Sequence, residues 1–201
     1  MPDGKLICVS GASRSGKTVY VMRSVASARR IVVWDVEAQW CEIPGFRRVS
    51  SRAALVAAAQ APGDMRLAYV EQGDIIKGFD LWSGCVLYAG RYVEPLTAVA
   101  EEVADVTSSA RAPGNWGMLL RRGLKRGINI YAISQRWQEA DKTALGNASG
   151  LVVFRATTRQ DAEYIASRAG AGAEDVWNLR PLEYMRVATH TREIERGVLT
   201  F

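Results

Sequence analysis

Residues 11–18 of the chain read Gly11-Ala12-Ser13-Arg14-Ser15-Gly16-Lys17-Thr18. This stretch fits the pattern G-x-x-x-x-G-K-[S/T] at every fixed position. Gly11 permits a sharp turn of the backbone, and Gly16 lets the backbone approach ligand oxygens without a Cβ clash. The backbone N–H groups of the stretch then point inward, and the helix that follows turns its positive dipole end toward them. The stretch therefore predicts a phosphate-binding loop made by all of its residues.

The segments on either side of the loop support this interpretation. An apolar run, Lys5–Ser10, predicts a buried strand before the loop, and Lys17–Arg29 predicts an amphipathic helix after it. In this setting Lys17 brings a full charge to the β- and γ-phosphate oxygens, and the Thr18 hydroxyl ligates Mg²⁺. The predicted ligands are therefore a nucleoside triphosphate and Mg²⁺.

Apolar runs rich in β-branched residues alternate with helix-like segments along the rest of the chain. Further strands are expected at Ile31–Val36, Arg66–Val70, Leu96–Ala100, Ile128–Ser134 and Leu151–Arg155. Helices are expected at Ser51–Gln60, Asp80–Ala89, Trp116–Lys125, Lys142–Leu145 and Arg159–Ala169. Two final segments, Tyr184–Thr189 and Gly197–Phe201, look like an antiparallel hairpin. This alternation predicts an α/β fold in one domain, residues 1–201, with a mostly parallel sheet covered on both faces.

The composition fits a globular protein, with 48% hydrophobic residues and a net charge of +5. The sequence has neither an apolar run long enough to cross a bilayer nor the features of a signal peptide. Cys8, Cys41 and Cys85 are widely spaced, and Cys8 and Cys85 lie in apolar or helix-like segments, which predicts buried thiols rather than a metal or redox site. The single histidine, His190, has no partner motif. A cytosolic, reducing location is expected.

Two acidic residues directly follow the strand Leu96–Ala100. Ligands of open α/β sheets collect at the carboxyl ends of the strands, so an acid that ends a neighbouring parallel strand meets the bound phosphates. We expect Glu101 to orient Mg²⁺ through water and Glu102 to act as the base for an attacking water. The alternative is a helix N-terminus that carries acids for its dipole alone. Asp35 also ends an apolar strand, with Glu37 close behind, and is expected as a secondary polar group near the site.

Gln135 follows the strand Ile128–Ser134, which is expected beside the strand of the phosphate loop. An amide at this position can hydrogen-bond the γ-phosphate or the attacking water and report hydrolysis to distant parts of the protein. A glutamine at the end of a strand is common, so this signal gains specificity only from its order after the loop and the two acids.

A basic stretch runs from Val106 to Gln138 without an acidic residue. Its basic residues are Arg111, Arg121, Arg122, Lys125, Arg126 and Arg136. Such a stretch faces nucleic acid, bound triphosphate or only solvent, and charge does not choose among the three.

The order GASRSGKT, then TAVAEE, then RRGLKRGINIYAISQR resembles the HerA–FtsK group of P-loop motor ATPases, which have a RecA-like three-layer αβα fold. The chain looks most like the small DNA-packaging ATPases of membrane-containing icosahedral phages and archaeal viruses, over nearly its whole length. The resemblance implies ATP hydrolysis, a ring that is usually a hexamer, and double-stranded DNA that the ring pumps into a preformed capsid. Gln135 matches the family's sensor position.

The resemblance also implies that an arginine from the next subunit completes each site. The family often has G-R-x-x-G where this chain has Gly123-Leu124-Lys125-Arg126-Gly127, so the expected arginine is missing. The candidates for this arginine finger are then Arg122, Arg126, Arg136, Arg155 and Arg159. A domain of this size leaves DNA to loops that line the ring's pore, and the segment Arg111–Arg126 is our hypothesis for part of that lining. Capsid or vertex proteins are further expected partners, which places the protein in the host cytoplasm or at the packaging vertex.

Two alternative functions stay open. A small P-loop kinase would carry a lid with several arginines, whereas the paired acids Glu101 and Glu102 suit water activation better than phosphate transfer to a metabolite. A phage morphogenesis NTPase that does not act on DNA typically carries a transmembrane segment, and none is evident in the sequence. The choice between ATP and GTP stays open as well, and the absence of an N-K-x-D motif only leans away from GTP.

Overall fold

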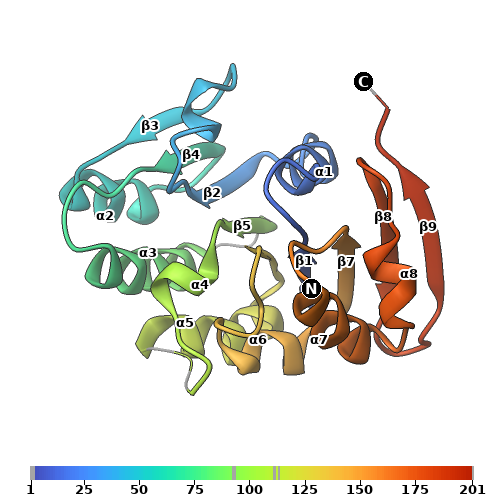
Figure 1. The fold of residues 1–201 in the computed structure, drawn as a ribbon. Coiled ribbons are helices and arrows are strands. Elements are labelled where there is room, and N and C mark those ends of the chain that lie inside the picture. The colour runs from blue at the N-terminus through green and yellow to red at the C-terminus, as the bar shows by residue number, and fades with distance from the viewer. Residues whose placement is uncertain (1–2, 92–93, 111, 113, 201) are drawn as a thin grey trace.

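The computed structural model describes residues 3–91, 94–110, 112 and 114–200. In this part of the chain nine strands form one sheet, in the order β3-β4-β2-β5-β6-β1-β7-β8-β9 (Figure 1). The strands are β1 (Leu6–Ser10), β2 (Arg30–Trp34), β3 (Arg47–Val49), β4 (Met65–Tyr69), β5 (Leu96–Ala100), β6 (Ile128–Ser134), β7 (Gly150–Phe154), β8 (Glu183–Ala188) and β9 (Ile194–Val198). From β3 to β7 in this order all neighbours are parallel, and β8 pairs antiparallel with both β7 and β9. The predicted mostly parallel sheet with a C-terminal hairpin is confirmed.

The α-helices are α1 (Lys17–Ser24), α2 (Arg52–Gln60), α3 (Ile75–Ala89), α4 (Val103–Val106), α5 (Gly114–Met118), α6 (Lys142–Asn147), α7 (Arg159–Ala169) and α8 (Ala173–Trp177). Short helical turns of other types lie at Trp40–Glu42, Leu119–Gly123 and Leu124–Arg126. Polar side chains fix several helix starts: Ser51 caps α2 and Thr158 caps α7, each by accepting a backbone N–H three residues on. The starts of these two helices were therefore readable from the sequence.

Alternation of side chains along the strands divides the interior into two cores. On β1, Leu6 and Cys8 pack into the larger core and Val9 into the smaller one. The larger core fills the space between the sheet and α2, α3, α5, α6 and α7. Among the described α-helices only α1 contributes to the smaller core, through Val21, and Val25 directly after its end adds to it. The two faces of the sheet are thus both covered, as predicted, but unequally.

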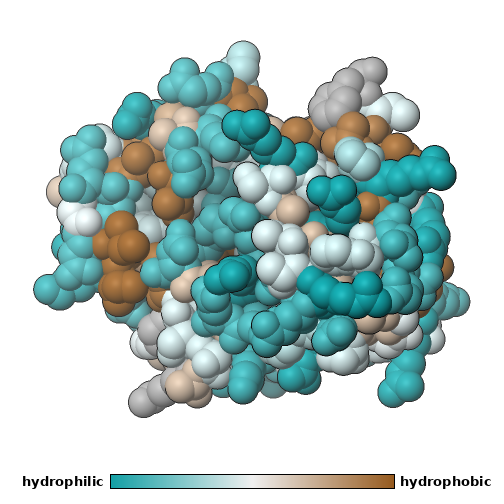
Figure 2. All heavy atoms as spheres, viewed as in Figure 1, coloured by the Kyte–Doolittle hydropathy of each residue, from teal (hydrophilic) through white to brown (hydrophobic). Residues whose placement is uncertain are grey.

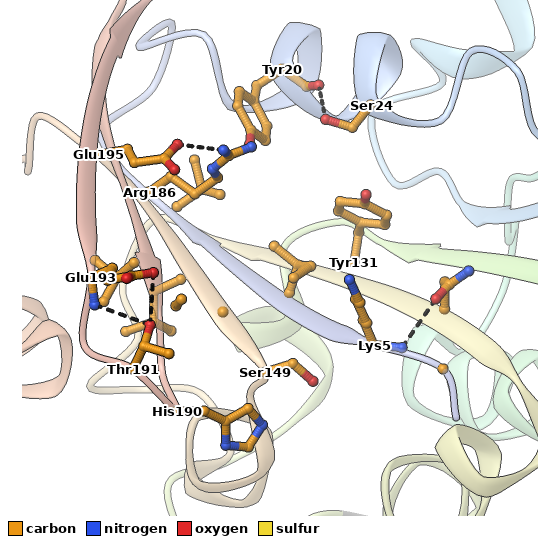
Figure 3. Close-up of a pocket in the computed structure, with 18 residues that line it drawn as sticks. Lys5, Tyr20, Ser24, Tyr131, Ser149, Arg186, His190, Thr191, Glu193 and Glu195 are labelled. Atoms are coloured by element: carbon orange, nitrogen blue, oxygen red, sulfur yellow. Dashed lines mark hydrogen bonds and ion pairs between the residues drawn. The ribbon is translucent and has the colours of Figure 1, made fainter. Parts of the chain in front are cut away.

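The part of the second face that α1 leaves open forms a concavity of about 1110 Å³. Figure 3 shows this concavity, with Tyr20 and Ser24 of α1 on one side, Tyr131 of β6 on its floor, and Arg186 paired with Glu195 on the hairpin. No residue of the phosphate loop lines it. The phosphate loop faces a different cavity, described below.

The surface is mostly hydrophilic on the face shown in Figure 2, where hydrophobic residues gather at the left, over α2 and α3. The exposed hydrophobic side chains of α3 are Ile75, Ile76 and Tyr88. No helix in the described part of the chain is both long enough and apolar enough to span a bilayer. Cys8 and Cys85 are buried, as predicted, and burial raises the pKa of both thiols.

Two predicted helices have the wrong bounds. α1 ends at Ser24 rather than Arg29, because the chain makes irregular turns over the next residues before it enters β2. α3 starts at Ile75 rather than Asp80, because the Asp74 carboxylate accepts the backbone N–H groups of the first turn at 3.1 Å.

The helix predicted at Trp116–Lys125 is also wrong as a single element. The chain forms α5, then a π-helical turn at Leu119–Gly123 and a 3₁₀ turn at Leu124–Arg126, which Gly127 caps. The φ angle of Gly127 is 71°, a left-handed conformation that suits glycine at a helix end. The sequence analysis also missed β3, α4 and α8, which are all short.

Candidate nucleotide-binding site

The phosphate loop and the predicted polar groups meet at one edge of the sheet. Gly11, Glu101 and Gln135 directly follow β1, β5 and β6, whose carboxyl ends lie side by side because β6 pairs with both other strands. The prediction that β6 lies beside the strand of the phosphate loop is confirmed, whereas the acids do not follow an immediate neighbour of β1. The acids still reach the loop, because α1, which begins in the loop, leads the chain from β1 past β6 and β5 to β2.

The phosphate loop has the backbone geometry that its glycines predict. The φ angles of Gly11 and Gly16 are 152° and 108°. A Cβ at Gly11 would lie 2.6 Å from Phe154 Cβ, and one at Gly16 would lie 2.7 Å from Leu199 Cδ1. The Ser15 hydroxyl is buried and has no hydrogen-bond partner among the described residues. A phosphate oxygen in the loop would satisfy this buried donor.

Lys17 lies inside the loop rather than in solvent. Its side chain is buried, and Nζ donates a hydrogen bond to the Ala12 carbonyl at 2.9 Å. Burial lowers the pKa of the Lys17 ammonium, and the negative charges of Glu102 and Glu101 oppose this effect. The ammonium is therefore held where it can contact a bound phosphate.

Glu101 is bonded to the loop directly. Its Oε1 accepts the Thr18 hydroxyl at 3.1 Å and the Trp40 indole Nε1–H at 2.9 Å. Burial raises the pKa of Glu101 to about 7; the hydrogen bonds from Trp40 and Thr18 work against this, and the nearby charges of Asp35 and Glu102 add to it. The sequence analysis missed Trp40, because no local pattern relates it to a residue sixty-one positions away.

Asp35 lies near the site, but its carboxylate is used to fold a turn. It is fully buried and accepts the backbone N–H groups of Gln39, Trp40 and Cys41 at 2.9, 3.1 and 3.0 Å. This network shapes the turn after β2 that carries the indole to Glu101. The predicted secondary polar group therefore acts on the turn rather than on a ligand.

Glu102 and Gln135 are hydrogen-bonded to each other. One carboxylate oxygen of Glu102 accepts the Gln135 backbone N–H at 3.2 Å, and the other accepts Gln135 Nε2 at 3.1 Å. Glu102 has φ 42° and ψ 57°, a left-handed conformation that costs a non-glycine residue roughly 1–2 kcal/mol. Such strain persists where the surrounding structure enforces it, which is common at functional sites.

These groups border one open cavity of about 430 Å³. Its lining includes Lys17, Thr18, Glu101, Glu102 and Gln135. Two residues of the turn after β2, Glu37 and Gln39, also line it. The structure thus brings the predicted loop, acids and sensor together around a single polar space.

The candidates for the arginine finger lie at both ends of the parallel strands. Arg122 and Arg126 precede β6, at the edge opposite the phosphate loop, and Arg126 donates to a backbone carbonyl of α3 at 3.1 Å. Arg136 follows β6 and forms an ion pair with a glutamate three residues on, at 2.7 Å. Arg155 follows β7, and its carbonyl accepts an N–H of the phosphate loop at 2.8 Å. Arg159 begins α7 and is paired with a glutamate of α8.

The hypothesis of a basic pore lining concerned Arg111–Arg126. Arg121 and Lys125 have exposed side chains on the turns that precede β6. Arg111 lies outside the described residues.

Known proteins resemble the chain in sequence and in fold. The chain matches no family profile. Protein P9 of Pseudoalteromonas phage PM2 is 31% identical over 137 residues, which are 67% of this chain and 61% of the phage protein. The genome packaging NTPase B204 of Sulfolobus turreted icosahedral virus 2, solved with AMPPCP, superposes with a TM-score of 0.82 over 98% of both chains, at 11% identity. B204 of Sulfolobus turreted icosahedral virus, described as a DNA-packaging ATPase, superposes with a TM-score of 0.75 over the full length of both chains, at 14% identity.

The fold likeness covers the whole of the site. Both B204 structures extend over the phosphate loop, the central strands and the terminal hairpin of this chain. The match to the PM2 protein adds a relative from a phage, although it spans less than two thirds of that protein. The predicted resemblance is confirmed at the level of architecture, and the chain has the fold of the small viral genome-packaging NTPases.

Proposed function

We propose that the chain is a Mg²⁺-dependent ATPase that moves double-stranded DNA, as a motor for packaging a viral genome into a preformed capsid. The observation that carries the proposal is the hydrogen bond from Thr18 to Glu101. Glu102 and Gln135 are hydrogen-bonded to each other and line the same cavity. A loop that only bound phosphate would need neither acid. The likeness to B204, which was solved with nucleotide analogues and is described as a packaging NTPase, supports the same activity.

The residues present suit Mg²⁺. Thr18 and Glu101 offer a hydroxyl and a carboxylate, the hard oxygen donors that Mg²⁺ prefers. Mg²⁺ usually binds through one or two protein ligands and keeps several waters. We therefore assign Thr18 as a direct ligand and Glu101 as a ligand through water. The bound ion would neutralise developing charge on the phosphates.

The remaining groups have roles that follow from their positions. Lys17 exchanges its hydrogen bond to Ala12 for one to a phosphate oxygen, and Ser15 donates its unpaired hydroxyl. Glu102 accepts a proton from the attacking water. Gln135 contacts Glu102 through both backbone and side chain, so a change at the γ-phosphate that moves this amide also changes the environment of the base.

The proposal also includes binding to DNA and assembly of the chain into a ring. The net charge of +5 and the exposed Arg121 and Lys125 suit phosphate contacts that do not depend on sequence. A ring, by resemblance a hexamer, lets a neighbour supply an arginine to each site, and a capsid vertex is the place where such a motor would dock.

The test is ATP turnover with and without double-stranded DNA, together with the mass in solution by light scattering. We expect hydrolysis that DNA stimulates, by an assembly of several subunits. Phosphate transfer from ATP to a small acceptor by a monomer would overturn the proposal and favour a kinase.

A further inference from the structure

The turn after β2 links the nucleotide site to a tryptophan outside the sequence motifs. Trp40 is 1% exposed, and its indole Nε1–H donates to the same Glu101 oxygen that accepts the Thr18 hydroxyl. No described residue donates a hydrogen bond to the other oxygen of Glu101. We propose that Trp40 is a positioning residue, which holds one oxygen of Glu101 beside Thr18 and leaves the other for the water shell of Mg²⁺. This inference rests on the proposed function, whose site it extends.

The turn that carries Trp40 is well suited to hold the indole in place. The buried Asp35 carboxylate accepts three successive backbone N–H groups, from Gln39 through Cys41. Hydrogen bonds from N–H groups to an ionised acceptor are among the stronger ones in proteins. The Trp40 ring also packs edge-on against Phe46, with 5.4 Å between ring centroids. The indole therefore has little freedom to leave Glu101.

The partner of Trp40 distinguishes it from the other buried tryptophans. The indole N–H groups of Trp34 and Trp82 have no hydrogen-bond partner among the described residues. Trp137 donates to a backbone carbonyl at 3.1 Å, and Trp116 donates to the Asp141 carboxylate at 3.0 Å. Trp40 alone of these five has a partner that lines the nucleotide cavity.

The expected effect is on Mg²⁺ rather than on the nucleotide alone. Residues that hydrogen-bond the ligands of a metal typically change its affinity about 10- to 100-fold when they are removed. Glu101 acts through water, so we expect the low end of this range. Trp40→Phe keeps an aromatic ring beside Phe46 but removes the indole N–H together with part of the ring, so binding of nucleotide without Mg²⁺ should change far less than binding of Mg²⁺.

The experiment measures binding of a fluorescent, non-hydrolysable ATP analogue as Mg²⁺ is raised. We compare the wild type, Trp40→Phe and the matched control Trp116→Phe, which also removes an indole bond to a buried carboxylate, but to one that does not line the nucleotide cavity. The half-saturating Mg²⁺ concentration should rise about tenfold in Trp40→Phe alone. Equal Mg²⁺ dependence in the two variants overturns the positioning role. A wild type that binds no nucleotide overturns the proposed function as well.

A second measurement needs no substitution in the site. In ¹⁵N–¹H spectra of the wild type loaded with the analogue, the Trp40 indole resonance should shift on addition of Mg²⁺ more than those of Trp116 and Trp137. This readout keeps the inference testable if Trp40→Phe fails to fold. An indole resonance that ignores Mg²⁺ while the analogue is bound overturns it.

Discussion

The replacement of Glu102 by glutamine tests the proposed base most sharply. Glutamine has the same shape and keeps an oxygen for the Gln135 backbone N–H, now 3.2 Å from the carboxylate. The second bond, from Gln135 Nε2 at 3.1 Å, is regained if one amide turns over, because an amide offers both a donor and an acceptor. We expect the free energy of unfolding to fall by less than about 1.5 kcal/mol, the net value of one hydrogen bond.

The effect on turnover should be far larger than the effect on stability. A positioned general base contributes about 10²- to 10⁴-fold to a rate. This factor corresponds to roughly 2.7–5.4 kcal/mol in activation free energy, at about 1.36 kcal/mol for each factor of ten. The kcat of ATP hydrolysis should fall accordingly. Affinity for a non-hydrolysable analogue should stay near the wild-type value, because Lys17, Thr18 and the loop are unchanged.

The assay is phosphate release at saturating ATP and Mg²⁺, with analogue binding measured on the same preparations. Glu163→Gln is the matched control, since it neutralises an exposed carboxylate on α7. Wild-type turnover in Glu102→Gln would refute the reasoning and reassign the base. A parallel loss of binding and turnover would mean that the substitution disturbs the loop.

Three further predictions follow from the same geometry. Gly16→Ala should abolish analogue binding but leave a cooperative thermal transition, because the φ angle of Gly16 is 108° and the new Cβ would lie 2.7 Å from Leu199 Cδ1. Unchanged affinity for the analogue would contradict the loop geometry. Burial raises the pKa of Glu101 from 4.5 to about 7, so the folded protein holds this proton more tightly than the unfolded one and, without Mg²⁺, loses stability as pH rises from about 4.5 through 7. The loss of stability between pH 5 and pH 8, measured by urea denaturation, should be smaller in Glu101→Gln than in the wild type by on the order of 3 kcal/mol. Equal losses in Glu101→Gln and the wild type would count against the raised pKa of Glu101. Neutralising Arg121 and Lys125 should lower the salt slope of DNA binding by about 2 in titrations with labelled duplex, and an unchanged slope would remove these residues from the pore lining.

Local patterns predicted the fold to the extent that each element carries its own signal. The bounds of β5, β6 and α7 match the prediction, because apolar β-branched runs and the Thr158 cap mark them. The segment Trp116–Lys125 failed, because glycines within an apolar, basic run leave the helix type to tertiary packing. Asp74 was a readable cap, and attention to it would have corrected the start of α3.

The residues of the site likewise divide into those that a sequence pattern reveals and those that it does not. The proposed phosphate contacts follow from a contiguous motif, and the positions of Glu101, Glu102 and Gln135 follow from the rule that parallel strands present their carboxyl ends together. Trp40 joins the site only through a turn that Asp35 shapes, and no periodicity in the sequence reveals a bond across sixty-one positions. The finger arginine depends on a neighbouring subunit, so it stays a prediction for Arg122, Arg126, Arg136, Arg155 and Arg159.

The central claim is that hydrolysis at this site moves DNA. Displacement of a labelled third strand from a triplex, placed at the end of a linear duplex, reports this movement directly. We predict displacement by the wild type that requires ATP and Mg²⁺, and none by Glu102→Gln. Turnover of ATP that DNA does not stimulate, with the third strand left in place, would contradict the claim.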